Sequence, residues 1–396
     1  MELSKTKRTN ICCFIVLIGL PISLIGETTG FQTPDNWHTA RIYLPGAHSI
    51  TLGTPNITVA VLDNGVNFSH PALNQAAWEN INEIPMNGID DDNNGYIDDI
   101  IGWDFVNDDP VPLPTPDGKD NNDNLLVDEL LWHGTFIAGL ISGKDSINGF
   151  SGVAPSSKVM ALRILDSDAS FNESTWGEMA KAIDYAVSNG ADIISFSIWF
   201  SDNPPQVFYD ALKKTSAAEI PFIGVSGNEN GPVSYPGRIS DILCVGAISK
   251  KSIRASFSNY GPELDLVAPG DEITSSTQDG KYLTNSGTSY AAPLVAGTMA
   301  LMKAVNASLQ RADIEKILKE TAIDLGPLGK DKEYGYGLLD TENAVRIAAG
   351  LEPLQRNTEE VALPVIEFFV GVLLIQVLSV QRVRQIMKKK LNQSGE

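Results

Sequence analysis

Short, mostly apolar runs alternate with helical patterns along most of the chain. The runs with the length of strands are residues 57–62, 159–165, 193–197 and 222–225. Residues 175–189 instead carry apolar side chains at helical spacing, and Asn189 with Gly190 supplies a stop signal. Strands that are apolar on both faces and alternate with helices indicate a parallel sheet covered on both sides. We therefore predict a three-layer α/β fold with a mostly parallel sheet, plus an apolar helix at each terminus.

The N-terminal 30 residues form the first of these apolar ends. Lys5, Lys7 and Arg8 precede an apolar run at residues 11–25. Cations followed by an apolar run of about 15 residues are typical of a secretory signal. Residues that suit a cleavage site are sparse, so residues 1–30 are predicted to be a signal peptide or a retained signal anchor. A buried helix of a cytosolic protein is the alternative, which the preceding cations disfavour.

Residues 361–380 form the second apolar run, with the length of about 20 residues that crosses a bilayer. Its polar members include Glu367, which costs free energy in lipid. The basic residues that follow mark the cytoplasmic side. We predict a linker at 351–360, a transmembrane helix at 361–380 and a cytoplasmic tail at 381–396. The alternative is an amphipathic helix that lies on the domain or on the membrane.

Both ends therefore place one domain, residues 31–350, on the cell surface or in the periplasm. A formal net charge of −20 at pH 7 argues against binding to nucleic acid, because a polyanion repels an acidic protein. Cys244 is the cysteine outside the N-terminal apolar run, so no disulfide forms within this domain. The apolar residues around Cys244 predict that it is a small core side chain.

Candidate reactive residues lie at the ends of the predicted elements. Asp63 directly follows the first strand pattern, and His133 begins a helical pattern. Ser289 follows a glycine-rich turn that leads to an apolar helix at residues 294–302. Reactive groups gather beyond the carboxyl ends of parallel strands, and a serine at a helix start gains from the helix dipole. Taken singly, each residue is more often a turn residue, a cap or a packing residue.

The sequence around these residues resembles the subtilisin-like serine peptidases, or subtilases. VAVLDNGV at 59–66, HGTFIAG at 133–139 and SGTSYAAP at 286–293 resemble the aspartate, histidine and serine blocks of that family, in its chain order. Further segments match in order: GVAP at 152–155, VSGNE at 225–229, ASFSNYGP at 255–262, VAPG at 267–270 and YGYGL at 334–338. The resemblance covers about residues 37–348.

This resemblance implies a serine endopeptidase that acts on polypeptides, with Asp63, His133 and Ser289 as its catalytic triad. Ser289 would form an acyl-enzyme, His133 would carry the proton, and Asp63 would orient the histidine. Asn228 corresponds to the oxyanion-hole amide of the family. The residues that correspond to its substrate-binding segments are Ser197, Ile198, Trp199, Ser226 and Gly227.

An acidic loop precedes the histidine block. DDDNNGYIDD at residues 90–99 places oxygen ligands at alternating positions around a glycine, a pattern that suits calcium. The predicted ligands are Asp90, Asp92, Asn94, Asp98 and the backbone carbonyl of Tyr96. The bidentate glutamate of an EF-hand is missing, because Ile101 stands at its position. Some subtilases carry similar calcium-binding inserts, and a solvated acidic turn without metal is the alternative.

The chain departs from the family in two places that bear on function. Trp199 stands where the family commonly has glycine, and a tryptophan there would crowd a bound peptide. The stretch before residue 57 is too short for the usual pro-domain. These departures leave open a catalytically silent subtilase fold that serves as a binding module. A second alternative is a peptide-processing acyl transferase, which transfers the acyl group to an amine instead of to water. The mass of the product would distinguish this reaction from hydrolysis, because a cyclic or ligated product lacks the added water.

Overall fold

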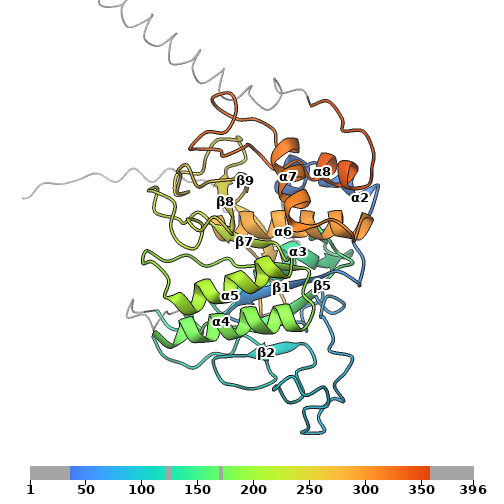
Figure 1. The fold of residues 1–396 in the computed structure, drawn as a ribbon, viewed down its shortest axis with the longest axis vertical. Coiled ribbons are helices and arrows are strands. Elements are labelled where there is room, and N and C mark those ends of the chain that lie inside the picture. Colours follow the sequence, from blue (N-terminus) through green and yellow to red (C-terminus); the bar gives the residue numbers. More distant parts are fainter. Residues whose placement is uncertain (1–35, 121–125, 169–172, 357–396) are drawn as a thin grey trace, which may run out of the picture. The chain divides into compact units, whose positions relative to one another are not determined.

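A seven-stranded sheet runs through the computed structural model, which describes residues 36–120, 126–168 and 173–356 (Figure 1). Each neighbouring pair of its strands is parallel. In order across the sheet, the strands are β2 (Gly102–Asp104), β5 (Lys158–Arg163), β1 (Thr58–Asp63), β6 (Ile193–Ser195), β7 (Phe222–Val225), β8 (Leu243–Ile248) and β9 (Leu266–Pro269). The predicted parallel sheet is confirmed.

Helices cover both faces of this sheet, as Figure 1 shows. Helices α3 (His133–Ser142) and α6 (Thr288–Val305) lie on one face, and α4 (Glu173–Ser188) and α5 (Gln206–Ala217) lie on the other. Successive residues of β1 point to opposite faces, as the pleat requires. Val59 and Val61 join the apolar cluster around α3 and α6, whereas Ala60 and Leu62 join the cluster around α4 and α5. The three-layer prediction is therefore confirmed.

Shorter elements complete the described part of the chain. On the α6 side lie α1 (Trp37–Arg41), α2 (Leu44–His48), α7 (Arg311–Thr321) and α8 (Thr341–Ala348). The two hairpins are β3 (Lys144–Asp145) with β4 (Phe150–Ser151), and β10 (Ile273–Ser276) with β11 (Tyr282–Asn285). Residues 351–356, predicted as linker, are bound to the domain, since Arg356 donates to Asp340 at 2.7 Å.

The structure also tests the predictions for Cys244 and for the helix at residues 294–302. Cys244 lies in β8 and is fully buried, as expected. The helix expected at 294–302 begins earlier, at Thr288, and continues through Pro293. Within the described residues no helix is long and apolar enough to cross a membrane. Residues 1–30 and 361–380, where the terminal helices were predicted, lie outside the described residues.

Candidate active site

The parallel sheet brings the candidate residues to one end of the domain. Asp63 is the last residue of β1, while Ser197 and Asn228 follow the ends of β6 and β7. The carboxyl ends of parallel strands meet at the same edge, so these residues lie close together. His133 is the first residue of α3 and Ser289 is the second residue of α6. Residues far apart in the chain therefore meet at the ends of rigid elements.

Asp63 and His133 form a direct pair. The Nδ1 atom of His133 lies 2.9 Å from both carboxylate oxygens of Asp63. The backbone N–H of Asn64 donates to the same carboxylate at 2.8 Å. Asp63 is 1% exposed and the side chain of His133 is 13% exposed. This pairing keeps the proton of a neutral imidazole on Nδ1, which leaves Nε2 free to accept another.

Two glycines allow α3 to begin against the end of β1. A Cβ atom on Gly134 would lie 2.3 Å from the carbonyl oxygen of Gly65, so no larger residue fits there. Gly65 itself has a φ of +106°, in the region that side chains avoid. The N–H of Gly134 donates to the side chain of Asn64 at 2.9 Å. These contacts fix the first residue of α3 beside Asp63.

Ser289 is tied to the strand end at Ser197. Its hydroxyl donates to the backbone carbonyl of Ser197 at 2.9 Å, and the hydroxyl of Ser197 donates to the carbonyl of Ser289 at 3.0 Å. Proton transfer from Ser289 to His133 therefore requires the Ser289 hydroxyl to turn away from the Ser197 carbonyl. Catalytic hydrogen bonds are often absent or long before substrate binds, so this geometry is compatible with a nucleophile.

Asn228 is oriented by the residue next to Ser289. Its side-chain oxygen accepts hydrogen bonds from the backbone N–H and the hydroxyl of Thr288, at 2.9 and 2.8 Å. This orientation leaves the Nδ2 group of Asn228 as a donor beside the Gly287 turn. Asn259 holds the loop from behind, because its side-chain oxygen accepts the N–H groups of Glu229 and Gly231.

A cavity of about 280 Å³ joins these residues. His133, Asn228 and Ser289 line it together with the predicted substrate residues Ser197, Ile198 and Trp199. Ser226 and Gly227 do not line this cavity, and both are buried behind Asn228. Leu130, Leu165 and Tyr290 also line it and were not singled out from the sequence. The position of Tyr290 directly after Ser289 is the sequence feature that could have identified it as a cavity residue.

The acidic loop gathers carboxylates around a residue that the sequence analysis missed. Oxygens of Glu83, Asp90 and Asp92 lie within 4.8 Å of one another. Glu83 is 6% exposed and accepts the backbone N–H of Asp91 at 2.8 Å. Asp98 is turned toward another part of the loop, where it accepts the N–H groups of Asn87 and Gly88. This set of hard oxygen donors is of the kind that binds calcium.

The other predicted ligands connect this loop to the core. The side-chain amide of Asn94 donates to Asp92 and to the fully buried Asp99 at 3.3 and 2.9 Å. Tyr96 donates its backbone N–H to the side chain of Asn94 at 2.8 Å. Burial raises the pKa of Asp99, which also accepts the hydroxyl of Tyr185 from α4. The acidic loop is therefore anchored to the helix layer beneath it.

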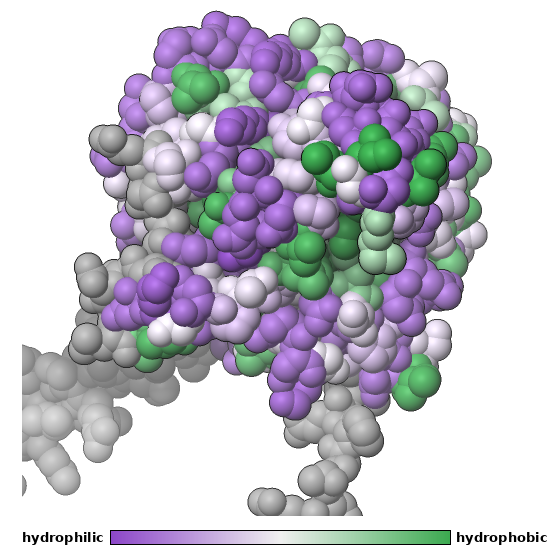
Figure 2. Space-filling view, turned by 90° about the horizontal axis from the view of Figure 1, so that it is seen from below, coloured by the Kyte–Doolittle hydropathy of each residue, from purple (hydrophilic) through white to green (hydrophobic). Residues whose placement is uncertain are grey.

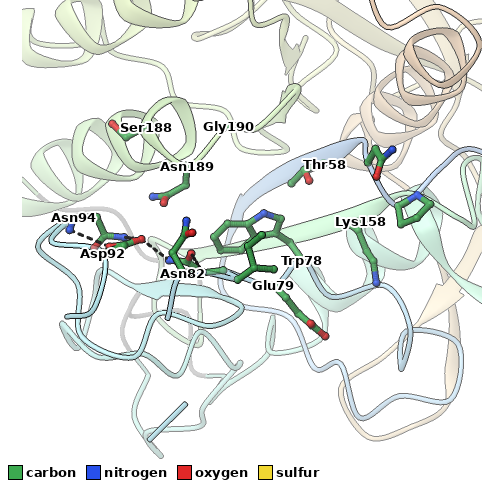
Figure 3. Close-up of a pocket in the computed structure, with 14 residues that line it drawn as sticks. Thr58, Trp78, Glu79, Asn82, Asp92, Asn94, Lys158, Ser188, Asn189 and Gly190 are labelled. Atoms are coloured by element: carbon green, nitrogen blue, oxygen red, sulfur yellow. Dashed lines mark hydrogen bonds between the residues drawn. The ribbon is translucent and has the colours of Figure 1, made fainter. Parts of the chain in front are cut away.

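A larger cavity, of about 850 Å³, lies elsewhere (Figure 3). Thr58 and Lys158, the first residues of β1 and β5, line it. It therefore lies at the amino end of the sheet, opposite to Asp63. Figure 3 shows Trp78, Asn82 and Asn189 around it. The described residues that line it include no pair like Asp63 and His133, so the smaller cavity is the candidate for catalysis despite its size.

Figure 2 shows the molecule from below the view of Figure 1. Hydrophilic side chains cover most of this face, and hydrophobic side chains adjoin one another near its centre. Exposed apolar residues in the segment before the acidic loop include Ile81 and Met86, at 88% and 93% exposure. Single exposed apolar side chains are common on soluble domains and define no site by themselves.

Comparison with known proteins identifies relatives along most of the chain. The family model described as "Subtilase family" matches residues 54–337. An alkaline protease of Shouchella clausii is 32% identical over 321 residues, which is 81% of this chain and 72% of that protein. Subtilisin Savinase of Lederbergia lenta is 32% identical over 311 residues, which is 78% of this chain and 98% of that protein.

Among solved structures, a lanthipeptide protease has a similar fold. Its TM-score is 0.62 at 23% identity, over 78% of this chain and 93% of that one. At this identity the likeness concerns the fold.

Proposed function

Because the chain belongs to the subtilase family, we propose that it is a serine endopeptidase that uses Asp63, His133 and Ser289. The observation that carries the proposal is the 2.9 Å pairing of His133 with Asp63, beside a cavity that Ser289 also lines. A buried carboxylate paired with an imidazole, beside a cavity that a serine hydroxyl also lines, supports a role in acyl transfer.

The first half of the reaction forms an acyl-enzyme. The Ser289 hydroxyl turns from the Ser197 carbonyl toward His133, whose Nε2 accepts its proton as the oxygen attacks the scissile carbonyl. Asp63 holds the imidazole and stabilises the imidazolium that forms. The C–N bond then breaks, and His133 gives the proton to the leaving amine. In the second half, water attacks the ester while His133 accepts a proton from it. His133 then returns that proton to the Ser289 oxygen as the ester C–O bond breaks and the acid product leaves.

Negative charge develops on the substrate carbonyl oxygen during both halves. Asn228 is the proposed donor to that oxygen, together with the backbone N–H of Ser289. The hydrogen bonds from Thr288 support this role, because they fix the Asn228 amide through its oxygen and leave the Nδ2 group available as a donor among the described residues. A donor that is already oriented stabilises the transition state without further reorganisation. The backbone of residues 197–199 is the proposed pairing partner of an extended peptide.

The test is labelling with a serine-directed fluorophosphonate, followed by digestion and mass analysis. We expect the label on Ser289 and its loss in Ser289→Ala. The matched control is Ser286→Ala: this serine lines the same cavity, but its hydroxyl donates to Asp271 at 2.8 Å. Labelling that survives Ser289→Ala, or fails in the folded wild-type protein, would favour the silent binding module.

We further propose that the acidic loop binds calcium as a structural ion. Glu83, Asp90 and Asp92 supply the carboxylates, and Asn94 and Tyr96 remain proposed ligands from the sequence pattern. Asp98 remains a proposed ligand on condition that its carboxylate turns away from the N–H groups of Asn87 and Gly88. The short distances among the carboxylates support a cation, because like charges repel one another without a counter-ion. An ion that binds only the folded loop stabilises the fold by mass action.

We also propose that residues 361–380 anchor the enzyme in a membrane, with residues 31–350 outside the cytoplasm and residues 381–396 inside. The support is the apolar run followed by basic residues, with an N-terminal segment of signal type before the domain. Substrates are then secreted or surface polypeptides within reach. Full-length protein should enter the membrane fraction, and deletion of residues 361–396 should release it. Recovery of the intact chain in the soluble fraction without detergent contradicts the anchor.

A further inference from the structure

The imidazole of His133 lies beside two aromatic rings, which also adjoin each other. The ring centroid of Trp132 is 5.8 Å from that of His133, and the centroid of Tyr290 is 6.1 Å from it. Both planes are tilted to the imidazole, by 53° and 48°. Trp132 and Tyr290 also lie 6.3 Å from each other. These distances are within the range at which aromatic rings attract.

Both rings are fixed in place. The indole N–H of Trp132 donates to the backbone carbonyl of Glu129 at 2.9 Å. The next residue, Leu130, donates its backbone N–H to Ser167, in the segment after β5. Tyr290 is 4% exposed, and its ring lies 4.6 Å from that of the fully buried Phe136. The two rings therefore form a rigid aromatic bracket along one side of His133.

The charge of this bracket does not oppose a protonated histidine. Beside the imidazole stand the ionisable side chains of Asp63, from the end of β1, and Tyr290, from α6. Burial raises the pKa of Tyr290, and the negative charge of Asp63 raises it further. The phenol is therefore neutral near pH 7. Aromatic faces attract cations, so the two rings favour the imidazolium over the neutral imidazole.

We propose that Trp132 and Tyr290 are positioning residues that hold the His133 imidazole and stabilise its protonated form during acyl transfer. The inference rests on the proposed function, because it requires His133 to accept the proton of Ser289. Trp132 precedes His133 and Tyr290 follows Ser289 in the chain. Both residues act through His133, and neither is proposed to contact the reacting atoms of the substrate.

The test measures the second-order rate of fluorophosphonate labelling against pH in the full-length protein. This rate follows the neutral fraction of His133 and needs no knowledge of the natural substrate. Trp132→Leu and Tyr290→Leu keep the surroundings apolar while removing the ring face. In each variant we expect the apparent pKa of His133 to fall by about half a unit and the plateau rate to fall roughly threefold to tenfold.

Three controls separate this role from packing. Tyr290→Phe keeps the ring and should keep the wild-type pKa of His133. Trp132→Phe keeps a weaker ring face, so it should lower the pKa of His133 by less than Trp132→Leu does. This variant maintains the test if a leucine variant fails to fold. Phe136→Leu disturbs the same cluster without flanking His133, so it should lower the melting temperature and leave the pKa of His133 unchanged.

The outcomes are distinguishable. Folded leucine variants with the wild-type pKa and plateau rate overturn the inference, and so does a Phe136→Leu protein whose pKa shifts as much as theirs. Slower labelling with an unchanged pKa also overturns it, because that result indicates a packing role. Absence of Ser289 labelling in the folded wild-type protein overturns the proposed function, and the inference falls with it.

Discussion

Ser197 and Ser289 exchange two hydrogen bonds, each hydroxyl donating to the backbone carbonyl of the other residue. Pro293 explains why the carbonyl of Ser289 needs this partner. In a regular helix that carbonyl accepts the N–H of the residue four positions later, but that residue is Pro293, which has none. The hydroxyl of Ser197 takes the place of the missing donor. The end of β6 therefore fixes the first turn of α6, where the proposed nucleophile lies.

Replacement of Ser197 by alanine should leave the Ser289 carbonyl buried without a donor. We expect Ser197→Ala to lower the free energy of unfolding by about 1–3 kcal/mol, the cost of an unsatisfied buried polar group. Fluorophosphonate labelling of Ser289 should also slow, because its backbone loses a fixed position. Urea unfolding and labelling rates measure the two effects.

Ser195, the last residue of β6, provides a matched control two positions before Ser197. It is 1% exposed and its hydroxyl has no hydrogen-bond partner among the described residues. Ser195→Ala should therefore be neutral or slightly stabilising. If Ser197→Ala costs no more stability than Ser195→Ala, the hydroxyl of Ser197 does not replace the missing helix donor.

Removal of the Asn228 amide should reduce turnover with little effect on substrate binding. We expect Asn228→Ala to lower kcat about 10²–10³-fold, the range found for the oxyanion-hole asparagine of subtilisin itself, with KM almost unchanged. Steady-state kinetics on a peptide substrate measures both constants. Thr288→Val removes one of the two hydrogen bonds that orient Asn228 and should give a smaller loss of kcat. A rise in KM at unchanged kcat would assign Asn228 to ground-state binding.

The sheet and the proposed triad could be predicted because their signals are local or lie in short motifs. β1 is mostly apolar and Asp63 ends it, so strand, turn and candidate acid follow from adjacent residues. The start of α6 could not be placed in this way. Proline normally breaks a helix interior, yet α6 passes through Pro293. The compensating contact comes from Ser197, which is distant in the chain and visible only in the fold.

The acidic loop shows a second limit of sequence reasoning. Asp90 and Asp92 were predicted from their spacing around Gly95, and they lie together in the structure. Glu83 lies outside that repeat, and the folded-back loop brings it to the same point. Asp98 has a φ of 56° and accepts hydrogen bonds from Asn87 and Gly88. Spacing identifies the donor types, whereas the path of the loop decides which oxygens converge.

Calcium should raise the thermal stability of the protein. With calcium at about 100 times its Kd, binding should add about 2.7 kcal/mol to the free energy of unfolding, and EDTA should remove that increment. Asp92→Asn should weaken the response, because it removes a carboxylate from the cluster with Glu83 and Asp90. Differential scanning calorimetry with calcium and with EDTA measures the change in melting temperature.

Asp210→Asn is the control for a general effect of charge. Asp210 lies on α5, where it forms a surface ion pair with Lys213 at 2.9 Å. This variant should respond to calcium like the wild type. Equal melting temperatures of the wild-type protein in calcium and in EDTA would contradict a structural calcium site.

Acidification should destabilise the fold in part through His70. Its Nδ1 accepts the N–H of Ala72 at 3.0 Å, and its Nε2 donates to the carbonyl of Lys281 at 3.0 Å. Burial lowers the pKa of His70 from 6.5, so the unfolded chain takes up the proton first. The stabilising contribution is complete above pH 6.5 and is lost as the pH falls from there toward the lower folded-state pKa.

Urea unfolding at a series of pH values tests this contribution. His70→Asn can still accept from Ala72 but does not titrate in this range, so its free energy of unfolding should depend less on pH than that of the wild type. His48, whose pKa burial also lowers, remains in both proteins and adds the same slope to each. Equal slopes for the two proteins would show that His70 does not contribute to the acid sensitivity.

Trp199 should restrict the peptides that reach Ser289. It lines the cavity with Ile198 and Ser197, and it packs against the apolar cluster that contains the start of α6. Trp199→Gly should raise kcat/KM for extended peptides by roughly tenfold, because a backbone can approach glycine closely. A short ester that reaches only Ser289 should react at an unchanged rate. Trp199→Phe, which keeps a ring at this position, should resemble the wild type. If Trp199→Gly instead lowers kcat/KM for extended peptides and leaves ester hydrolysis intact, the indole is a wall that substrates bind, and the crowding expected from the sequence is wrong.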